Sequence, residues 1–242
     1  MEDRAPQPSL TRAFETPATK ARYVRRLFST IAGRYDLITR LLSFGNDQRW
    51  KRRVIELAGV RSGSRVLDLA CGTGDLAFLA AARGASVTGL DVTTRMLELA
   101  RAKPEGRRIG WIAGDMCALP IASASCDVVT TGYGLRNVPD LAGALGEIDR
   151  VLAPGGTLCS LDFDRPDWFP LRVVYLAYLT LVGSTLGFAL HGNPDTYRYI
   201  PESIRRYPGA RRVADMLKAS GFQDVLHVPV LGGLMAIHVA KK

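Results

Sequence analysis

The stretch VLDLACGTGD, Val66 to Asp75, decides the fold. Its first residues form a short apolar run that predicts a buried strand over Val66–Leu69, and the turn that follows leads directly into a segment with helical periodicity. Gly72 and Gly74 in this turn let the backbone bend sharply and approach a ligand that any side chain would push away. The order of strand, glycine loop and helix is typical of α/β proteins that bind a ligand at the loop.

Short apolar runs continue to alternate with helical segments beyond the glycine loop. Further strands are predicted over 86–90, 109–113, 127–131, 157–161, 225–231 and 234–240, and helices over 75–82, 94–102, 141–152 and 210–220. Such strands form a parallel sheet with right-handed crossovers and bind ligands beyond their carboxyl ends. The last two strands, joined by Gly232 and Gly233, are expected to form a hairpin at the sheet edge. The predicted fold class is α/β, a mixed, mostly parallel seven-stranded sheet with helices on both faces.

Composition and length limit the class of protein and the number of domains. The chain has 242 residues, of which 47% are hydrophobic and 23% charged. This mixture excludes a disordered, collagen-like or coiled-coil chain and can fill a sizeable core. The length favours one large domain with additions. We expect a flexible tail over residues 1–19, a basic helical cap over 20–60, and a sheet domain over 61–242 with an apolar insertion over 168–200.

Positive charge is concentrated at the N-terminal end. Residues 1–53 contribute +7 of the net charge of +9, from 12 basic and 5 acidic side chains. A polybasic end suggests an anionic partner, either nucleic acid or the cytoplasmic face of a membrane, or else a solvated helix face rich in arginine. Nucleic acid is not expected as a partner, because the basic end lacks the interleaved aromatic residues on which single strands stack.

Cysteine and histidine spacing indicates neither a disulfide framework nor a metal site. The four cysteines form no CxxC pair, and the three histidines have no metal-ligand spacing. The first twenty residues contain no apolar stretch long enough for a signal peptide. We therefore expect no metal and a cytoplasmic location.

Acidic residues after the next two strands indicate what the glycine loop binds. Asp91 follows the second predicted strand, where a carboxylate can accept both hydrogen bonds of a ribose diol, so a nucleoside-containing cofactor is implied. The loop alone leaves a nicotinamide cofactor open, because GTGDLA also fits the GxGxxA dinucleotide fingerprint. Asp115 follows the third strand, where it can accept from an adenine amino group while Met116 covers the ring. With the later VLAPGGTL turn, this succession resembles the Rossmann-like class I methyltransferases that use S-adenosylmethionine.

Four further motifs resemble a narrower family. They are FSTIAGRYDLITRLLSFGNDQRWKR (28–52), GLRNV (134–138), RVLAPGGTLCSLDF (150–163) and YRYIPESIRRYP (197–208). In this order they are similar to the marks of the ubiquinone and menaquinone biosynthesis C-methyltransferase family, over roughly residues 22–240. The resemblance implies methyl transfer from S-adenosylmethionine to a ring carbon of a prenylated quinol precursor.

The resemblance also implies roles for individual residues. The methyl donor would be held by the glycine loop, the strand ends and the edge of the fourth strand: Gly72, Thr73, Gly74, Asp91, Asp115, Met116 and Gly132. Arg136 and Asn137 would face the quinol ring, and Tyr35 and Asp36 would close the pocket from the N-terminal side.

The chain also departs from the family pattern. These departures are Thr39 for a common Asn, Asp47 and Gln48 for His and Arg, Ala153 for Lys, Asp162 for Glu and Asp164 for Ser. Without the family's His at position 47, an acid or base role for that side chain is not available. The Asp-containing version favours the menaquinone branch, with demethylmenaquinol rather than a benzoquinol as substrate.

The chemistry of the transfer suggests how these residues act. A ring carbon is a poor nucleophile until an ortho hydroxyl loses its proton, so a site for this reaction must favour the oxyanion. Our hypothesis is that Arg136 stabilises that charge, with Asn137 orienting the ring. Asp36, or a water it holds, is the hypothetical proton acceptor. Alternatively, Asp36 is a helix cap or a partner for Arg34 or Arg40.

Residues 173–190 form a stretch of 18 residues without a charge. A single membrane crossing is not expected, because strands of one sheet lie on both sides of the stretch and must share a compartment. It is either a buried crossover helix or a lid for a prenyl tail that dips into the bilayer surface, held there by the basic N-terminal region. The second interpretation predicts a cytoplasmic protein that is peripheral at the inner face of an anionic membrane. We also consider that the chain forms a homodimer.

Other functions remain open on the sequence. One alternative is a methyltransferase of the same build that acts on another apolar small molecule, because the substitutions at positions 39, 47 and 48 alter the family pattern. Another is a donor-binding but non-catalytic subunit of a quinone-synthesis complex. Nicotinamide oxidoreduction is the least favoured, since no hydride-acceptor site is apparent.

Overall fold

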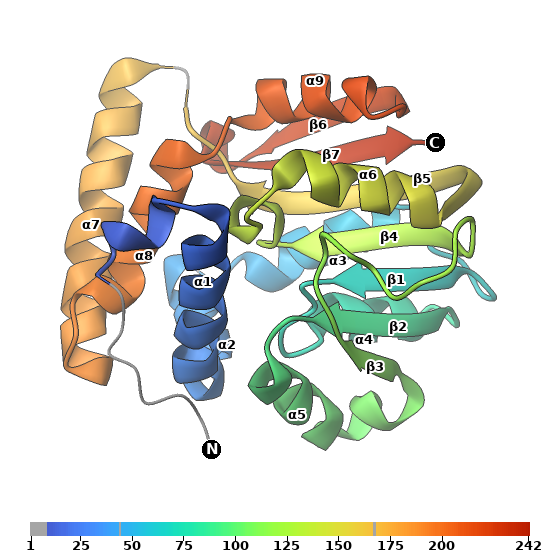
Figure 1. The fold of residues 1–242 in the computed structure, drawn as a ribbon, viewed down its shortest axis with the longest axis horizontal. Coiled ribbons are helices and arrows are strands. Elements are labelled where there is room, and N and C mark those ends of the chain that lie inside the picture. The colour runs from blue at the N-terminus through green and yellow to red at the C-terminus, as the bar shows by residue number, and fades with distance from the viewer. Residues whose placement is uncertain (1–8, 44, 167) are drawn as a thin grey trace.

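The computed structural model describes residues 9–43, 45–166 and 168–242 and contains one seven-stranded sheet with the order β3-β2-β1-β4-β5-β7-β6 (Figure 1). The strands are β1 (Arg65–Leu69), β2 (Ser86–Asp91), β3 (Gly110–Ala113), β4 (Cys126–Gly132), β5 (Leu152–Phe163), β6 (Gln223–Val230) and β7 (Met235–Lys241). Strands β1 to β5 are parallel, and β7 is antiparallel to both β5 and β6. The predicted fold class is therefore confirmed.

Helices cover both faces of the sheet. One core joins the sheet to α6 (Leu141–Val151) and α9 (Ala210–Ala219). The other joins it to α3 (Asp47–Leu57) and α4 (Asp75–Ala81). The central strands are buried on both sides, as expected for parallel strands between two helical layers.

The predicted elements of the sheet domain all exist, with small differences at their ends. Helix α5 (Thr94–Ala102) has the predicted bounds. Strand β5 starts at Leu152, immediately after α6, so the turn around Pro154 belongs to the strand. In the predicted C-terminal hairpin, only β6 is an edge strand, because β7 pairs with β5.

The N-terminal cap contains α1 (Pro17–Ile31) and α2 (Tyr35–Leu42) in addition to α3. Helix α1 starts within the stretch expected to be a flexible tail, because Thr16 forms a capping box and proline is favourable in the first turn of a helix. A short 3-10 helix, η1 (Arg12–Phe14), precedes it and buries Ala13 completely. Order in the described chain thus begins before residue 20, while residues 1–8 lie outside the described part.

The apolar insertion forms two helices, α7 (Phe169–His191) and α8 (Asp195–Arg206). They approach closely at Gly183, where a Cβ would lie 3.0 Å from the carbonyl oxygen of Tyr197. A Cβ at residue 187 would lie 2.6 Å from the carbonyl oxygen of Asn193, in the turn that connects the two helices. Figure 1 shows α7 at the outer end of the molecule, with α8, α1 and α2 between it and the strand ends. Tyr197 and Tyr199 of α8 pack with α1 and α2.

Helix α7 is not a buried crossover helix, and that interpretation of the apolar stretch is wrong. Only 22% of its most apolar 18-residue window is buried, although its length and composition would suit a membrane span. A single crossing would place β5 and β7 on opposite sides of the bilayer, yet these strands are hydrogen-bonded to each other. Helix α7 therefore presents an apolar face outward without spanning.

Candidate active site

Two cavities meet at the carboxyl ends of the parallel strands. The strand-end cavity, about 750 Å³ of empty space partly open to solvent, is lined by Gly72, Asp91, Asp115, Met116 and Gly132 together with residues of α1. The apolar cavity, about 590 Å³ of empty space that is likewise partly open to solvent, lies between α1, α2 and α8, and Arg136 forms part of its wall. Both cavities are lined by the same three aromatic residues, Phe28, Tyr35 and Tyr133. A reaction between two ligands would take place beside these rings.

Asp91 connects the end of β2 to the glycine loop. Its Oδ2 accepts a hydrogen bond from the backbone N–H of Gly72 at 2.8 Å, and its Oδ1 accepts from that of Thr93 at 2.8 Å. Burial raises the pKa of this carboxyl above its ordinary value. Gly72 has a φ of +54°, a left-handed conformation that favours glycine. Asp91 also lines the strand-end cavity, so its carboxylate lies where it could accept from a ribose diol.

The other residues predicted to hold the donor divide into two groups. Asp115 and Met116 line the strand-end cavity, and Asp115 Oδ1 accepts from the backbone N–H of Cys117 at 2.9 Å. Thr73 and Gly74 are not among the residues lining either cavity. A Cβ at residue 74 would lie within 3 Å of the rings of Phe78 and Trp111, so this glycine allows close packing at the start of α4.

Arg136 lies in a short 3-10 helix, η4 (Leu135–Asn137), after β4 and is almost fully buried. Its Nη1 donates to Asp162 Oδ1 at 2.5 Å and to the carbonyl oxygen of Tyr133 at 3.0 Å. The guanidinium carbon lies 4.8 Å from the centre of the Phe163 ring. Burial alone would lower the pKa of Arg136, but Asp162 raises it overall, so the cation persists. Its buried Nε has no hydrogen-bond partner in the described part of the chain.

Asn137 lies beside Arg136 but lines the other cavity. Its Nδ2 donates to the carbonyl oxygen of Tyr133 at 2.7 Å, and its Oδ1 accepts from the hydroxyl of Tyr199 at 3.0 Å. Asn137 lines the strand-end cavity, whereas Arg136 lines the apolar one. The GLRN turn therefore contributes one side chain to each cavity.

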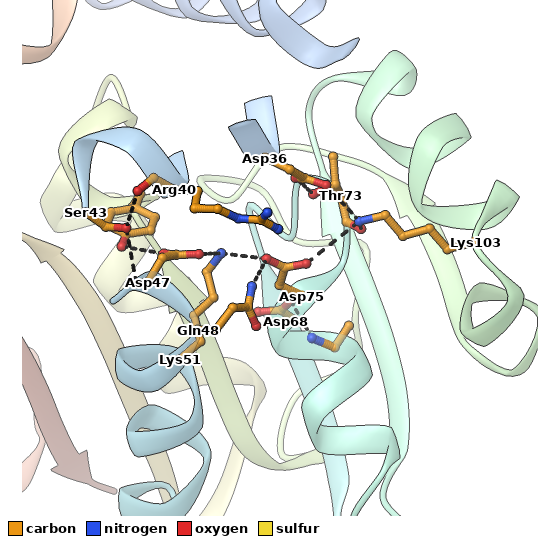
Figure 2. Close-up of polar contacts among 12 residues, drawn as sticks. Asp36, Arg40, Ser43, Asp47, Gln48, Lys51, Asp68, Thr73, Asp75 and Lys103 are labelled. Atoms are coloured by element: carbon orange, nitrogen blue, oxygen red, sulfur yellow. Dashed lines mark hydrogen bonds and ion pairs between the residues drawn. The ribbon is translucent and has the colours of Figure 1, made fainter. Parts of the chain in front are cut away.

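The two residues predicted at the N-terminal side of the pocket, Tyr35 and Asp36, are in different places. Tyr35 lines both cavities, and burial raises the pKa of its phenol. Asp36 lines neither of them. Its Oδ1 accepts from the Thr73 hydroxyl at 2.5 Å and its Oδ2 lies 3.1 Å from Lys103 Nζ (Figure 2). This geometry favours the ion-pair alternative for Asp36, and the partner is Lys103 rather than Arg34 or Arg40.

The model of the ubiE/COQ5 methyltransferase family matches residues 16–242. The chain belongs to this family. It is accordingly a methyltransferase that uses S-adenosyl-L-methionine.

Individual relatives agree with this family, and a solved structure agrees with the fold. The demethylmenaquinone methyltransferase of Thermus thermophilus is 44% identical over 89% of this chain and all of its own length. The ubiquinone/menaquinone biosynthesis C-methyltransferase UbiE of Rubrivivax gelatinosus is 39% identical over 90% of this chain and 86% of its own. A SAM-dependent methyltransferase structure from Thermotoga maritima has the same fold, with a TM-score of 0.66 and 18% identity, covering 90% of this chain and 99% of its own.

The residues at the strand-end cavity of this methyltransferase fit its methyl donor. Asp91 offers hydrogen-bond acceptors where a ribose would lie, and Met116 supplies an apolar wall for an adenine ring. Gly72 has no side chain, so a ligand can approach the backbone of the loop. In the described part of the chain, no group of three or more histidine, cysteine or acidic side chains could hold a metal ion.

Several residues of the site have no signal in the sequence. Lys20 of α1 donates from Nζ to the carbonyl oxygens of Arg136 at 3.0 Å and Val138 at 2.6 Å, which fastens the cap to the GLRN turn. Burial, with Arg136 nearby, lowers the pKa of Lys20 to about 8. From the sequence, a lysine in an arginine-rich helix is expected to be exposed to solvent. Tyr133, a non-glycine residue with a φ of +61°, is equally inconspicuous in the sequence.

Proposed function

We propose that this enzyme C-methylates a prenylated quinol in quinone biosynthesis, with demethylmenaquinol as the preferred substrate. One observation carries the proposal: the apolar cavity, with the buried guanidinium of Arg136 in its wall, lies beside the strand-end cavity that suits the methyl donor. Of the described residues lining the apolar cavity, Arg136 alone is charged. A hydroquinone ring with an apolar tail matches this combination of walls and charge. Relatives named for demethylmenaquinone methylation support the choice of substrate.

We assign Arg136 the role of holding the quinol oxygen as it becomes an anion. Bound S-adenosylmethionine supplies an electrophilic methyl group. The Nε–H of Arg136, without a partner in the described chain, is available to donate to the quinol oxygen, and its charge lowers the pKa of that hydroxyl. Asp162 and the Phe163 ring hold the guanidinium in place. Asn137, joined to Tyr199, shapes the neighbouring wall.

Positioning and exclusion of water supply the rest of the rate acceleration. An anionic ring carbon and a cationic sulfonium lose both charges as they react, so an apolar surrounding favours the transition state. Phe28, Tyr35 and Tyr133 stand where the two ligands meet and align them. The described lining of the apolar cavity includes no carboxylate or imidazole. In our proposal a single water molecule takes the proton of the quinol hydroxyl. After the methyl group has been transferred, the ring carbon loses its proton and the oxygen regains one, so one proton is released per methyl group transferred.

The test is methyl transfer by the purified full chain. The enzyme is incubated with S-adenosylmethionine and a chemically reduced short-chain demethylmenaquinone, and quinones are analysed by mass spectrometry. We expect one added methyl group per S-adenosylhomocysteine formed, and slower turnover with a short-chain benzoquinol. Tight binding of S-adenosylhomocysteine without methylation of either quinol would contradict the proposal and favour a non-catalytic subunit or another substrate.

We also propose that the enzyme works at the cytoplasmic face of an anionic membrane, where its prenylated substrate resides. Along α7 and at its start, large apolar side chains are between 63% and 71% exposed: Trp168, Phe169, Val174, Leu181 and Phe188. Leu37 and Leu41 of α2, whose neighbours line the apolar cavity, are each 51% exposed. Lipid tails would cover this apolar surface, and the net positive charge of the N-terminal region would be attracted to anionic headgroups. A homodimer through the same face is the competing arrangement.

A further inference from the structure

A network of charges, two of them buried, joins α3 to the start of α4 (Figure 2). Lys51 Nζ lies 2.7 Å from Asp47 Oδ2 and 2.8 Å from Asp75 Oδ2, and Asp47 and Lys51 are each only 5% exposed. Gln48 Nε2 also donates to Asp75 Oδ2, at 2.7 Å. Asp75 directly follows the glycine loop, so the network fixes α3 against the loop.

The same network reaches the turn that carries Arg136. Asp47 Oδ1 accepts a hydrogen bond from the phenol of Tyr133 at 2.7 Å. The carbonyl oxygen of Tyr133 in turn accepts from both Arg136 Nη1 and Asn137 Nδ2. The peptide group of Tyr133 thus orients the two side chains of the GLRN turn.

The backbone of Tyr133 needs such an anchor. Its φ of +61° is a left-handed conformation that non-glycine residues rarely adopt and that persists only where surrounding contacts enforce it. Three contacts restrain it: its N–H donates to Leu161 O at 2.7 Å, its ring packs against Phe163, and its hydroxyl is bound by Asp47.

We propose that Asp47, held by Lys51, is a positioning residue that acts through the Tyr133 hydroxyl to set the orientation of Arg136 and Asn137. This inference rests on the proposed function and adds to it a residue that supports the proposed site from outside. Asp47 lines neither cavity and acts through Tyr133. Burial alone would lower the pKa of Lys51, but Asp75 and Asp47 raise it overall, so Lys51 stays protonated. Burial and Asp47 raise the pKa of Tyr133, which keeps the phenol a donor.

The first test compares two phenol deletions. Tyr133→Phe removes only the hydroxyl bound by Asp47, and Tyr207→Phe is the matched control, because its buried hydroxyl has no partner in the described chain. Turnover is expressed per site that binds S-adenosylhomocysteine, so a partly unfolded sample does not mimic an effect. We expect kcat of Tyr133→Phe to fall about tenfold, with the Kd for S-adenosylhomocysteine within twofold and the control unchanged. Equal kcat per site in Tyr133→Phe and wild type would overturn the proposal.

A second readout does not depend on the identity of the substrate. The ¹⁵N-labelled Nε–H resonance of Arg136, assigned by its loss in Arg136→Gln, reports the guanidinium directly. We expect Tyr133→Phe to shift or broaden it and Tyr207→Phe to leave it in place. An unmoved resonance would overturn the inference, whereas absence of quinol methylation by the wild-type enzyme would overturn only the proposed function.

A pair of double variants separates the hydrogen bond from the ion pair. Asp47→Asn/Lys51→Met keeps an oxygen that accepts from Tyr133 while removing both charges, and Asp47→Leu/Lys51→Met removes the acceptor as well. We expect the first to keep at least a third of wild-type kcat per site and the second to fall to the level of Tyr133→Phe. Equal losses in the two variants would contradict positioning through the Tyr133 hydroxyl.

Discussion

Arg136 and Asp162 form a buried ion pair, with Nη1 and Oδ1 separated by 2.5 Å and both side chains at most 5% exposed. Asp162 also accepts from the backbone N–H of Arg136 at 3.1 Å. The carboxylate at the end of β5 therefore fixes both the main chain and the side chain of the residue that we propose to stabilise the quinol anion.

Breaking this pair from one side should destabilise the fold. Asp162→Leu leaves an uncompensated guanidinium in the interior, so we expect the free energy of unfolding in urea to fall by about 3–5 kcal/mol. Arg136→Met/Asp162→Leu removes both charges and should recover most of that loss while remaining inactive. If the double variant is as unstable as Asp162→Leu, the loss of stability does not come from an uncompensated charge on Arg136.

Asp36 should have little effect on turnover. Its side chain is 46% exposed and pairs with Lys103, and exposed pairs contribute about 0.2–1 kcal/mol. We expect Asp36→Asn to keep kcat within threefold of wild type under saturating donor and quinol, with Lys103→Met behaving similarly. Loss of a general base costs about 10²–10⁴-fold. A loss of that size in Asp36→Asn alone would restore the proton-acceptor hypothesis.

Lys20 should make stability depend on pH in the alkaline range. Its pKa is about 8 in the folded protein and 10.5 in the unfolded chain, chiefly because of burial. Between these values the unfolded state binds the extra proton, so the folded state is favoured as pH rises. We expect wild type to gain stability relative to Lys20→Met from pH 8 to pH 10 in urea unfolding. A constant difference across this range would show that Lys20 is not desolvated as the structure indicates.

The outer face of α7 should bind lipid. Leu181→Ser/Phe188→Ser exposes polar groups in place of two of the most exposed apolar side chains and should reduce sedimentation with anionic vesicles several-fold. Wild-type binding should also weaken at high salt, because charges at the surface are screened. Leu226→Ser, an exposed leucine on the edge strand β6, is the control. Salt-independent binding, or a dimer that the double variant dissociates, would contradict the membrane proposal.

The sheet was predictable because its signals are local. The helix over 94–102 is amphipathic, and the strand at Val66 leads directly into a glycine loop, so periodicity and turn residues determined both correctly. The start of α1 was missed because Pro17, a helix breaker in most positions, occupies the favourable first turn. Whether α7 is a buried crossover helix or an exposed lid could not be decided from the sequence, because composition does not specify which faces a helix covers.

The site was only partly predictable because its geometry depends on distant contacts. Asp91, Asp115 and Met116 follow strand ends, and the topology brings those ends together. The separation of Arg136 and Asn137 into different cavities depends on a carbonyl oxygen in a left-handed residue, which no spacing reveals. Lys20 contacts residues more than a hundred positions away, beyond the reach of any local pattern.

Arg136→Ala under saturating S-adenosylmethionine and short-chain demethylmenaquinol tests the role of the guanidinium directly. In our proposal the donor is held by Asp91 and the glycine loop rather than by Arg136, so the Kd for S-adenosylhomocysteine should stay within about twofold. Turnover per donor-binding site should fall at least tenfold, corresponding to about 1.4 kcal/mol of transition-state stabilisation. Equal turnover per site in variant and wild type would contradict the account.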